Sequence, residues 1–561
     1  MKGDKKYGII ALTLAVVSVV LIWIVGLSPA QQKALAQKDE KKDTIYSYVQ
    51  LIDAVAWSID SKYMEAVDRK ELIYSGIRGM LETLDPFSVM QEKKEYNQLM
   101  EMTQGKYQGL GMMIDLRDEI ITVVSPIEGT PAQKKGIRAG DKILEIDGKS
   151  TKGMSTEDAS KLMRGPAGTK VVLTIKREGL AEVLEYELER AVIQLKNVPY
   201  YGVLDNNIGY VRLSRFSEES GSELKNALEE LQKKKIKGLI LDLRNNGGGL
   251  LAQAVETADL FLNKGDLIVY TKGRGEEKIS EFLAQGNGFY KDAPLAVLVN
   301  NGSASASEIL AGAIQDWDRG VLIGDTTFGK GLVQQVFDMP NDVYLKLTTA
   351  KYYIPSGRSI QKPQLSKKHP STALVDSTRD KEIFHTKGGR IVYGGGGIVP
   401  DIEVKDEEIF TPLEINLERQ QMFFDFAVSY LAEHKDLPQN FEVTDQMVLQ
   451  FKDFLKKKNF TYRTALEIQV DSLEKTIKAQ EDGERYQETL KNLKKLVEED
   501  KEKDFDQSLS YIKRSIKRDI LNSLYGEKAV YEQVLLKDDP YVKKALEILT
   551  TKDKYLSILK S

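Results

Sequence analysis

The chain has 561 residues, of which 41% are hydrophobic and 29% are charged, and a chain of this length normally divides into several domains that each bury a core. It contains no cysteine, which excludes thiol catalysis, disulfide bonds, cysteine-based metal sites and lipid attachment through cysteine. The net charge of -4 argues against general nucleic-acid binding, which depends on an excess of lysine and arginine.

The N-terminal residues 1–36 predict export. Three lysines precede an apolar stretch at residues 7–27, which is long enough to span a bilayer and longer than the core of an ordinary signal peptide. Positive residues before the stretch place the N-terminus inside and the remainder of the chain outside, in the periplasm of the cell envelope. Small residues at 28–30 and 34–36 would permit cleavage, so a retained inner-membrane anchor and a cleaved signal peptide both stay open.

Residues 37–103 have a mostly helical pattern. Ile73, Ile77 and Leu81 lie at helical spacing and would form an apolar face. A proline at position 86 follows and marks the end of this pattern. The sequence therefore predicts an N-terminal helical region, which on its own pattern is a locally packed helix pair.

Residues 104–192 contain an ordered series of strand and turn signals. A Gly-Leu-Gly-Met turn precedes the first strand, Ile-Ile-Thr-Val-Val forms the second, and Gly-Asp-Lys-Ile-Leu begins another. This series resembles a PDZ domain. The resemblance implies that the segment binds a peptide as an added strand and holds its terminal carboxylate on the backbone N–H groups of Leu110, Gly111 and Met112.

A helix is predicted within the same module, after these strands. Ala159, Leu162 and Met163 lie at positions i, i+3 and i+4, which is the spacing of one helix face. This face would form the wall of the peptide groove or belong to the core of the module. Both interpretations stay open.

Residues 193–404 combine strand and helix signals. Apolar strands are predicted at residues 208–213, 238–241 and 295–299, with helical patterns between them, which is typical of an α/β core. The segment Asp-Leu-Arg-Asn-Asn-Gly-Gly-Gly follows the second strand at residues 242–249. Its glycines would let a backbone N–H approach a substrate oxygen closely, and a plain strand-to-helix loop is the other interpretation. Phosphate binding is disfavoured, because the loop lacks the Gly-Lys-Ser/Thr ending of a P-loop.

The third strand leads into the run Asn-Asn-Gly-Ser-Ala-Ser-Ala-Ser-Glu-Ile at residues 300–309. A turn followed by a helical pattern places these serines at a helix N-terminus, where free backbone N–H groups and the helix dipole can stabilise an oxyanion. Ser305 is therefore a candidate nucleophile. It is equally a candidate helix cap, because Ser305 and Glu308 fit a capping box.

A serine nucleophile needs a base, which is commonly a histidine or a desolvated lysine. The three histidines, His369, His385 and His434, all lie downstream of these motifs and outside patterned apolar segments. Lys330 is the more economical base, because an extended chain that begins there would place Lys330 and Gln334 on one face. A solvated lysine in a glycine turn is the other interpretation.

The C-terminal residues 405–561 are rich in lysine and glutamate and have helical periodicity. Such charge runs predict solvated helix faces. No sustained heptad pattern supports a long coiled coil. A role of this extension in partner docking or self-association stays open.

Two motifs together identify a family. The run Gly-Ser-Ala-Ser-Ala-Ser-Glu and the turn Thr-Phe-Gly-Lys-Gly resemble those of the carboxyl-terminal processing (tail-specific) proteases of the serine-lysine type, and the similarity extends to about residue 405. The resemblance implies that Ser305 is the nucleophile, Lys330 is the general base and Gln334 orients the lysine.

The resemblance also implies the positions of two oxyanion donors. One is the N–H of Ala306, directly after the nucleophile. The other is an N–H of the glycine-rich loop, at Gly247 or Gly248. Arg164 aligns with an arginine that in some relatives links the position of the PDZ domain to the protease site, and an ordinary surface arginine is the other interpretation.

The fold that the resemblance implies is multidomain α/β. It consists of a Clp-protease/crotonase-like α/β catalytic core with an inserted PDZ domain, an N-terminal helical region and a helical C-terminal extension. The implied activity is that of an exported serine endopeptidase, which cleaves proteins near their C-termini through an acyl-enzyme and needs no metal or organic cofactor. Its expected partners are protein substrates with free, disordered C-termini, and the resemblance allows a homodimer and an adaptor protein. The net charge of -4 argues against nucleic acid as a partner.

Two other functions account for part of the sequence. A noncatalytic PDZ scaffold of the cell envelope would use Ser305 as a helix cap, but it leaves Lys330 and Gln334 without a purpose. A crotonase-like enzyme acting on acyl thioesters would not explain the export segment or the PDZ module. For the protease, burial must lower the pKa of Lys330 from its usual ~10.4, so we expect activity to persist at neutral to alkaline pH.

Overall fold

The computed structural model describes residues 44–560, except 276, 364–381, 406–409, 435 and 480–482. The chain divides into two units, Met1–Leu84 and Asp85–Ser561. The predicted export segment and His369 lie outside the described residues. Within the described ranges, no helix is both long and apolar enough to cross a membrane.

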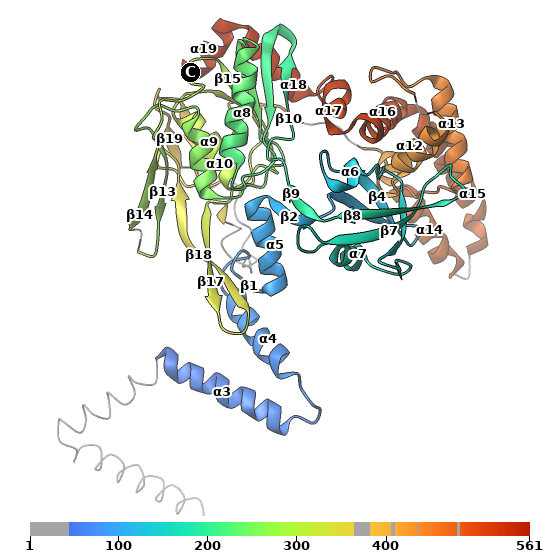
Figure 1. Ribbon diagram of the computed structural model, residues 1–561, viewed down its shortest axis with the longest axis horizontal. Coiled ribbons are helices and arrows are strands. Elements are labelled where there is room, and N and C mark those ends of the chain that lie inside the picture. Colours follow the sequence, from blue (N-terminus) through green and yellow to red (C-terminus); the bar gives the residue numbers. More distant parts are fainter. Residues whose placement is uncertain are drawn as a thin grey trace, which may run out of the picture. The chain divides into compact units, whose positions relative to one another are not determined.

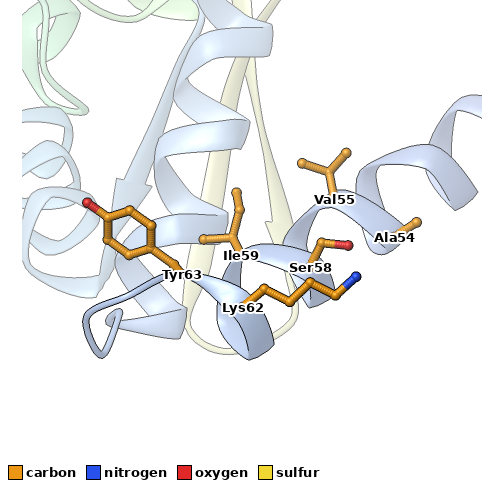
Figure 2. A pocket seen from close by; sticks show the side chains of 6 residues that line it. All are labelled: Ala54, Val55, Ser58, Ile59, Lys62 and Tyr63. Atoms are coloured by element: carbon orange, nitrogen blue, oxygen red, sulfur yellow. The ribbon is translucent and has the colours of Figure 1, made fainter.

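The first unit contains the helices α3 (Ile45–Lys62) and α4 (Arg69–Glu82). The side chain of Asp68 caps α4 by accepting the N–H of Glu71 at 3.0 Å. The predicted apolar face of α4 is only partly buried, since Leu81 is buried whereas Ile73 is 44% exposed. No residue of α3 is buried. Figure 2 shows the side chains that line a pocket on this helix, and these are Ala54, Val55, Ser58, Ile59, Lys62 and Tyr63.

The second unit contains a six-stranded sheet, the central sheet of the predicted α/β core (Figure 1). Its strands, in spatial order, are β10 (Tyr200–Leu204), β11 (Ile208–Arg212), β12 (Gly238–Asp242), β15 (Leu295–Val299), β16 (Val321–Gly324) and β21 (Ile402–Glu403). All neighbours are parallel except β10, which is antiparallel to β11. The three strands predicted from apolar runs are β11, β12 and β15.

Alternation along these strands creates two buried faces, because successive side chains of a strand point to opposite sides. Leu239 and Leu241 of β12 pack into a core with three helices on one face. These helices are α8 (Ser220–Lys233), α9 (Leu251–Asp259) and α10 (Ala306–Asp316). Ile240 belongs to a second core on the opposite face, so the sheet is covered on both sides, as a parallel sheet requires.

The far end of the C-terminal extension covers this second face. Its helices are α18 (Pro540–Thr550) and α19 (Lys552–Lys560). Val542 and Ile548 of α18 are buried against strands β11, β12, β15 and β16. The charged face of α18 is solvated, in agreement with the prediction, since Lys543 and Glu547 are 58% and 49% exposed. The opposite, apolar face of the helix packs on the sheet, and Figure 1 shows α18 and α19 beside these strands.

A second, five-stranded sheet carries the lysine turn at one end. Its strands are β1 (Val89–Glu92), β18 (Val343–Tyr353), β13 (Leu267–Lys272) and β14 (Lys278–Leu283), with β17 (Leu332–Met339) paired to β18. The predicted strand after the lysine turn is β17. It begins two residues after Lys330, and its pairing with β18 shifts register between Val333 and Gln334. The helix α5 (Lys93–Gln104) follows β1, and a small hairpin of β19 (Ile383–His385) and β20 (Ile391–Tyr393) lies later in the chain.

The PDZ module is a separate sheet with its own core. Its strands are β3 (Met112–Arg117), β4 (Ile120–Pro126), β5 (Lys142–Ile146), β6 (Lys149–Ser150), β7 (Lys170–Lys176) and β8 (Val183–Glu189). Before and after them, β2 (Lys106–Gly109) pairs with β9 (Ala191–Gln194), so the module leaves and rejoins the chain at one place, as an inserted domain would. The helices are α6 (Pro131–Lys134) and α7 (Thr156–Met163). Ala159 and Met163 of α7 are core residues, and Leu162 is partly buried against them.

The other part of the C-terminal extension is a helical domain. It contains α11 (Pro412–Arg419), α12 (Met422–Glu433), α13 (Asp445–Lys457), α14 (Ala465–Lys478), α15 (Gln487–Gln507), α16 (Leu509–Tyr525) and α17 (Glu527–Val530), followed by a π-helical turn at Tyr531–Leu535. Phe423, Phe451 and Ile516 lie in its core. The domain contacts the PDZ module through Asp425, which forms an ion pair with Arg117 of β3 at 2.6 Å.

Candidate active site

The predicted serines lie in a sharp turn between β15 and α10. Ser305 is the N-cap residue of α10 and has φ 55° and ψ -113°. A non-glycine residue with positive φ is unusual and costs free energy, and such residues cluster at functional sites. The carboxylate of Glu308 accepts the N–H of Ser305 at 2.8 Å. The helix-cap position and the candidate nucleophile are therefore the same residue.

Ser305 is more exposed to solvent than the two neighbouring serines of this turn. Ser303 and Ser307 are fully buried, and their hydroxyls donate to the main-chain oxygens of Leu243 and Asn246, each at 2.8 Å. Ser305 is partly exposed. It is therefore the serine of this turn that a substrate can reach.

Lys330 lies in a partly buried position at the end of the second sheet. Its Nζ is 4.6 Å from the centre of the Phe87 ring. Burial lowers the pKa of Lys330, and the like charge of Lys346 lowers it further, while the carboxylates of Glu308 and Asp85 act in the opposite direction. The net direction is downward, which is the shift that a lysine base needs.

Two buried side chains tie the backbones of Ser305 and Lys330 together. The fully buried carboxylate of Glu308 accepts the N–H of Ser305 at 2.8 Å and the N–H of Lys330 at 2.9 Å. The same carboxylate also accepts from the Thr327 hydroxyl. On the other side, the hydroxyl of Tyr352 contacts the main-chain oxygens of Ser305, at 3.2 Å, and Lys330. The nucleophile turn and the lysine turn therefore cannot shift independently.

Sequence reasoning missed both of these roles. Glu308 appeared there only as the partner in a capping box, and Tyr352 was not singled out. A signal was available for Glu308, because a carboxylate inside an otherwise apolar helix predicts either a buried partner or an exposed face.

The amide of Gln334 bonds outside the lysine turn. Its Nε2 donates to the Thr348 hydroxyl at 3.3 Å, and the N–H of Thr348 donates to the hydroxyl of Ser88 at 3.1 Å. The register shift next to Gln334 sets this direction. The orientation of Lys330 by Gln334 stays a prediction.

The glycine loop after β12 lies directly against the nucleophile turn. A Cβ atom on Gly248 would be 2.6 Å from the oxygen of Ala304 and 2.9 Å from the nitrogen of Ala306, and its φ is +94°. Only glycine fits this position. The N–H of Gly248 donates to the side chain of Asn246 at 2.9 Å.

The N–H groups of Gly247 and Ala306 are the available donors at this place. Neither has a hydrogen-bond acceptor among the residues that the structure describes. A Cβ atom on Gly247 would meet nothing within 4 Å, so this residue faces open space. Of the two predicted glycines, Gly247 thus has an N–H that can donate to a substrate. Gly248 instead allows the loop to pack closely on the nucleophile turn.

Asparagines connect the glycine loop to the nucleophile turn. Asn246 is fully buried, donates to the oxygen of Leu213 at 2.8 Å and accepts the N–H of Ala304 at 3.0 Å through its own main-chain oxygen. Asn300 donates to the side chain of Asn245 at 2.9 Å. Sequence reasoning did not identify these residues, because polar turn residues in loops carry no distinctive pattern.

The predicted carboxylate-binding turn of the PDZ module is also built on glycine. Gly111 has φ +79°, and a Cβ atom there would lie 2.3 Å from Cβ of Thr130. In the described chain the N–H groups of Leu110 and Gly111 have no acceptor, and Met112 begins the adjoining strand β3. This is the arrangement that holds a peptide carboxylate in such domains.

Arg164 follows helix α7 and contacts α5 outside the module. Its guanidinium forms an ion pair with Glu101 and lies 4.7 Å from the centre of the Tyr107 ring. The side chain is 42% exposed, so the surface pair by itself contributes little.

No histidine of the described chain hydrogen-bonds to Ser305. His385 is exposed on β19, and His434 stacks on Tyr430 with ring centres 4.1 Å apart. Within the described ranges, no three histidine, aspartate or glutamate side chains gather in a way that could hold a metal ion.

Four family models match parts of this chain. "Peptidase family S41" matches residues 207–368 and "PDZ domain" matches residues 122–177. "Probable PDZ-protease, C-terminal helical domain" matches residues 413–549, and "Activating protease CtpB N-terminal domain" matches residues 16–95. The matches cover the protease core, the PDZ module and both flanking regions.

The names of individual relatives describe C-terminal processing proteases. The chain is 44% identical over 307 residues to the carboxy-terminal-processing protease of Bartonella bacilliformis, which covers 54% of this chain and 70% of the relative. It is 36% identical over 377 residues to the carboxy-terminal processing protease CtpA of Bacillus subtilis, with coverage of 66% and 78%. A solved photosystem II D1 C-terminal processing protease matches at 31% identity and a TM-score of 0.35, with coverage of 63% and 86%. The chain therefore belongs to the C-terminal processing protease family, peptidase family S41, and is a serine-type C-terminal processing peptidase with a PDZ domain.

Proposed function

We propose that the chain cleaves proteins near their C-termini with Ser305 as the nucleophile and Lys330 as the general base. The observation that carries this proposal is the pair of shared side chains, Glu308 and Tyr352, which hold the backbones of both residues. The partial exposure of Ser305 supports its role as nucleophile. The lowered pKa of Lys330 supports its role as base.

The reaction begins when neutral Lys330 accepts the hydroxyl proton of Ser305. The Oγ of Ser305 forms a bond to the scissile carbonyl carbon, and the N–H groups of Ala306 and Gly247 stabilise the resulting oxyanion. Lys330 then donates its proton to the leaving amine, and the C–N bond breaks. Gln334 keeps the lysine side chain in place during these transfers.

Hydrolysis of the acyl-enzyme completes the cycle. Lys330 takes a proton from a water molecule, whose oxygen attacks the ester carbon. The ester bond breaks, the proton returns to Oγ of Ser305, and the new C-terminal carboxylate leaves. The chemistry requires no group beyond the side chains, the backbone donors and water.

The PDZ module would select the substrate by its free C-terminus. Its domain type binds peptide C-termini. The unpaired N–H groups at Leu110 and Gly111 would hold the terminal carboxylate, together with that of Met112. A disordered tail would then extend from this groove into the active site.

The test measures cleavage of a disordered polypeptide by a protein of residues 37–561 and by its Ser305→Ala and Lys330→Ala variants. Mass spectrometry identifies the products. We expect cleavage by the parent and by Lys351→Ala, a control at an exposed lysine of β18, and none by the other two variants. Equal cleavage by all four proteins would refute the catalytic assignment. An amidated copy of the polypeptide tests the PDZ groove, since it should be cleaved more slowly than the free acid.

We further propose that the protein is exported to the periplasm through residues 7–27. The lysines before this apolar stretch support the proposal. The N-terminal sequence of protein recovered from the envelope distinguishes a cleaved signal peptide from a retained anchor. Recovery of the intact chain from the cytoplasm alone would contradict export.

A second copy of the chain is the proposed partner of α3. This helix exposes large apolar side chains, among them Leu51, Val55 and Trp57, and a monomer rarely leaves such a face open. Light scattering should show a dimer for residues 37–561 and a monomer after replacement of the three residues by serine. A monomer mass for both proteins would refute the homodimer and would leave the apolar face to the proposed adaptor protein.

The two alternative functions lose support. A noncatalytic scaffold does not agree with membership in a peptidase family, whose nucleophile and base types are both present here. An acyl-thioester enzyme would share the core but not the PDZ module.

A further inference from the structure

The C-terminal extension contacts the glycine loop at Arg244. Arg244 begins this loop, three residues before Gly247. Its Nη2 donates to Oδ2 of Asp539 at 2.6 Å, and its guanidinium lies 4.7 Å from the centre of the Tyr541 ring. Asp539 is 295 residues away in the chain, so a segment outside the matched protease region touches the loop that carries a candidate oxyanion donor.

This contact is shielded from solvent. The side chains of Arg244 and Asp539 are 16% and 11% exposed. Arg244 also bonds Asp242, which is 1% exposed, and Arg212 bonds both Asp242 and the main-chain oxygen of Arg244. Burial alone would raise the pKa of Asp242, but the two arginines outweigh it and bring that pKa to about 2. The cluster is therefore a network of charged groups at neutral pH.

Asp539 is itself fixed by the helix that it begins. Its Oδ1 accepts the N–H groups of Tyr541, at 2.8 Å, and Val542, at 3.1 Å, and so caps α18. Its other oxygen accepts from Arg244. Because Val542 is buried against the central sheet, the carboxylate cannot move without the helix.

We propose that Asp539 is a positioning residue for catalysis, which holds Arg244 and through it the N–H of Gly247 in the oxyanion site. The C-terminal extension is then part of the catalytic structure. This inference rests on the proposed role of the glycine loop. It assigns to Asp539 a contact with Arg244 and none with the substrate.

The geometry explains why a distant pair controls the loop. Gly247 has open space around it, so no side chain limits its movement on the substrate side. The loop is held by Asn246 on the side of the nucleophile turn and by Arg244 on the side of α18. Loss of the Asp539 contact leaves Arg244 bonded to Asp242 and Arg212, without its anchor on α18. The loop is then held less tightly at this end, and a displacement of about 1 Å at a catalytic donor can cost about 10²-fold in rate.

The decisive variant is Asp539→Asn in the otherwise unchanged chain of residues 37–561. Asparagine is as good a helix cap as aspartate, so the substitution keeps the cap of α18 and removes the charge that Arg244 needs. The matched control is Asp538→Asn, which changes the neighbouring aspartate, 78% exposed and paired with Lys543 at the surface. Asp539→Ala removes both the cap and the charge.

Two readouts separate positioning from folding. The first is kcat for the disordered polypeptide, divided by the fraction of folded molecules. The second is the affinity for a peptide boronic acid, whose boron accepts Oγ of Ser305 and forms a tetrahedral anion like the reaction intermediate. A merely structural residue changes the folded fraction but not the boronate affinity of the molecules that remain folded.

We expect Asp539→Asn to lower kcat by about tenfold or more, against the ~10²- to 10³-fold that loss of a whole oxyanion donor costs. KM should stay unchanged and the boronate affinity should fall in parallel with kcat, while Asp538→Asn behaves as the parent. Parent-like kcat and boronate affinity per folded molecule in Asp539→Asn would overturn the inference. Failure of the proposed function has a different signature, because Lys330→Ala would then cleave like the parent.

Discussion

Replacement of Gly248 by alanine tests the close packing of the glycine loop on the nucleophile turn. The new Cβ atom would lie 2.6 Å from the oxygen of Ala304 and 2.9 Å from Cβ of Ser305. Ordinary contact requires a movement of roughly 0.5 to 0.8 Å, because ordinary Cβ contacts begin at 3.4 Å. The φ of +94° adds strain of about 1–2 kcal/mol for an L-residue.

Both effects act on the oxyanion site. The loop can relieve the clash only by moving away from the turn, and this movement takes the N–H of Gly247 with it. A displacement of this size should reduce kcat by about 10- to 100-fold and stability by about 2 kcal/mol. KM should change little, since the PDZ groove is untouched.

The assay measures kcat and KM on the disordered polypeptide together with urea unfolding. Gly247→Ala is the matched control, because its Cβ atom would meet nothing within 4 Å, and we expect parent-like stability. The reasoning is refuted if Gly248→Ala keeps the kcat of the parent per folded molecule. It is also refuted if the two alanine variants lose the same stability.

Three further predictions concern the proposed base Lys330, the contact of Tyr352 with both turns, and the carboxylate-binding turn of the PDZ module. Lys346→Gln removes a positive charge near Lys330 and so raises the pKa of Lys330. Because the proposed base must be neutral, the acidic limb of the kcat/KM profile should move to higher pH. An unchanged limb would show that Lys346 does not lower the pKa of Lys330. Tyr352→Phe removes the shared contact to the oxygens of Ser305 and Lys330, so we expect a loss of stability of about 1–3 kcal/mol and at least a tenfold lower kcat, and equal activity would rule out a positioning role. Gly111→Ala places a Cβ atom 2.3 Å from a threonine side chain, so binding of a free C-terminal peptide, measured by calorimetry on the Ser305→Ala protein, should fall at least tenfold.

Local patterns were sufficient to predict which elements carry the proposed nucleophile and base. An apolar strand, a turn and a helical pattern placed Ser305 at a helix N-terminus, and the structure has it there. The strand after Lys330 was predicted for the same reason, since alternation over a few residues depends only on neighbours in the chain. The strand order of the central sheet was not predicted, because pairing joins segments far apart in sequence.

The supports of the site escaped prediction because they are long-range contacts. Glu308 bonds the N–H of Lys330, 22 residues later, and Tyr352 reaches Ser305 across 47 residues. Gln334 illustrates the same limit, since period two predicted its face but the register shift in β17 determines its partner. The apolar residues of α18 have helical spacing in the sequence, but their partner, the central sheet, is again far away in the chain.

The coverage of the sheet by α18 and α19 leads to a prediction about truncation. A chain that ends at residue 535 would expose Ile240, Leu298 and Ile323, which are fully buried in the complete protein. Burial of each large aliphatic side chain contributes about 1.5–3 kcal/mol, and the lost contacts on both the helices and the sheet reach the ~5–15 kcal/mol that a domain has in total. We therefore expect this truncated chain to aggregate, although it retains Ser305, Lys330 and Gln334.

The matched control removes a larger piece from the middle of the same extension. The hairpin of α14 and α15 has a small core of its own, and the side chains of Glu467 and Lys501 meet at 3.1 Å, so residues 468–500 can be replaced by a short Gly-Ser linker. This variant should unfold cooperatively with a transition close to that of the parent, as followed by circular dichroism and size-exclusion chromatography. A soluble, cooperatively folded chain that ends at residue 535 would mean that the sheet does not need its second layer, and the structural role assigned to α18 would then be wrong.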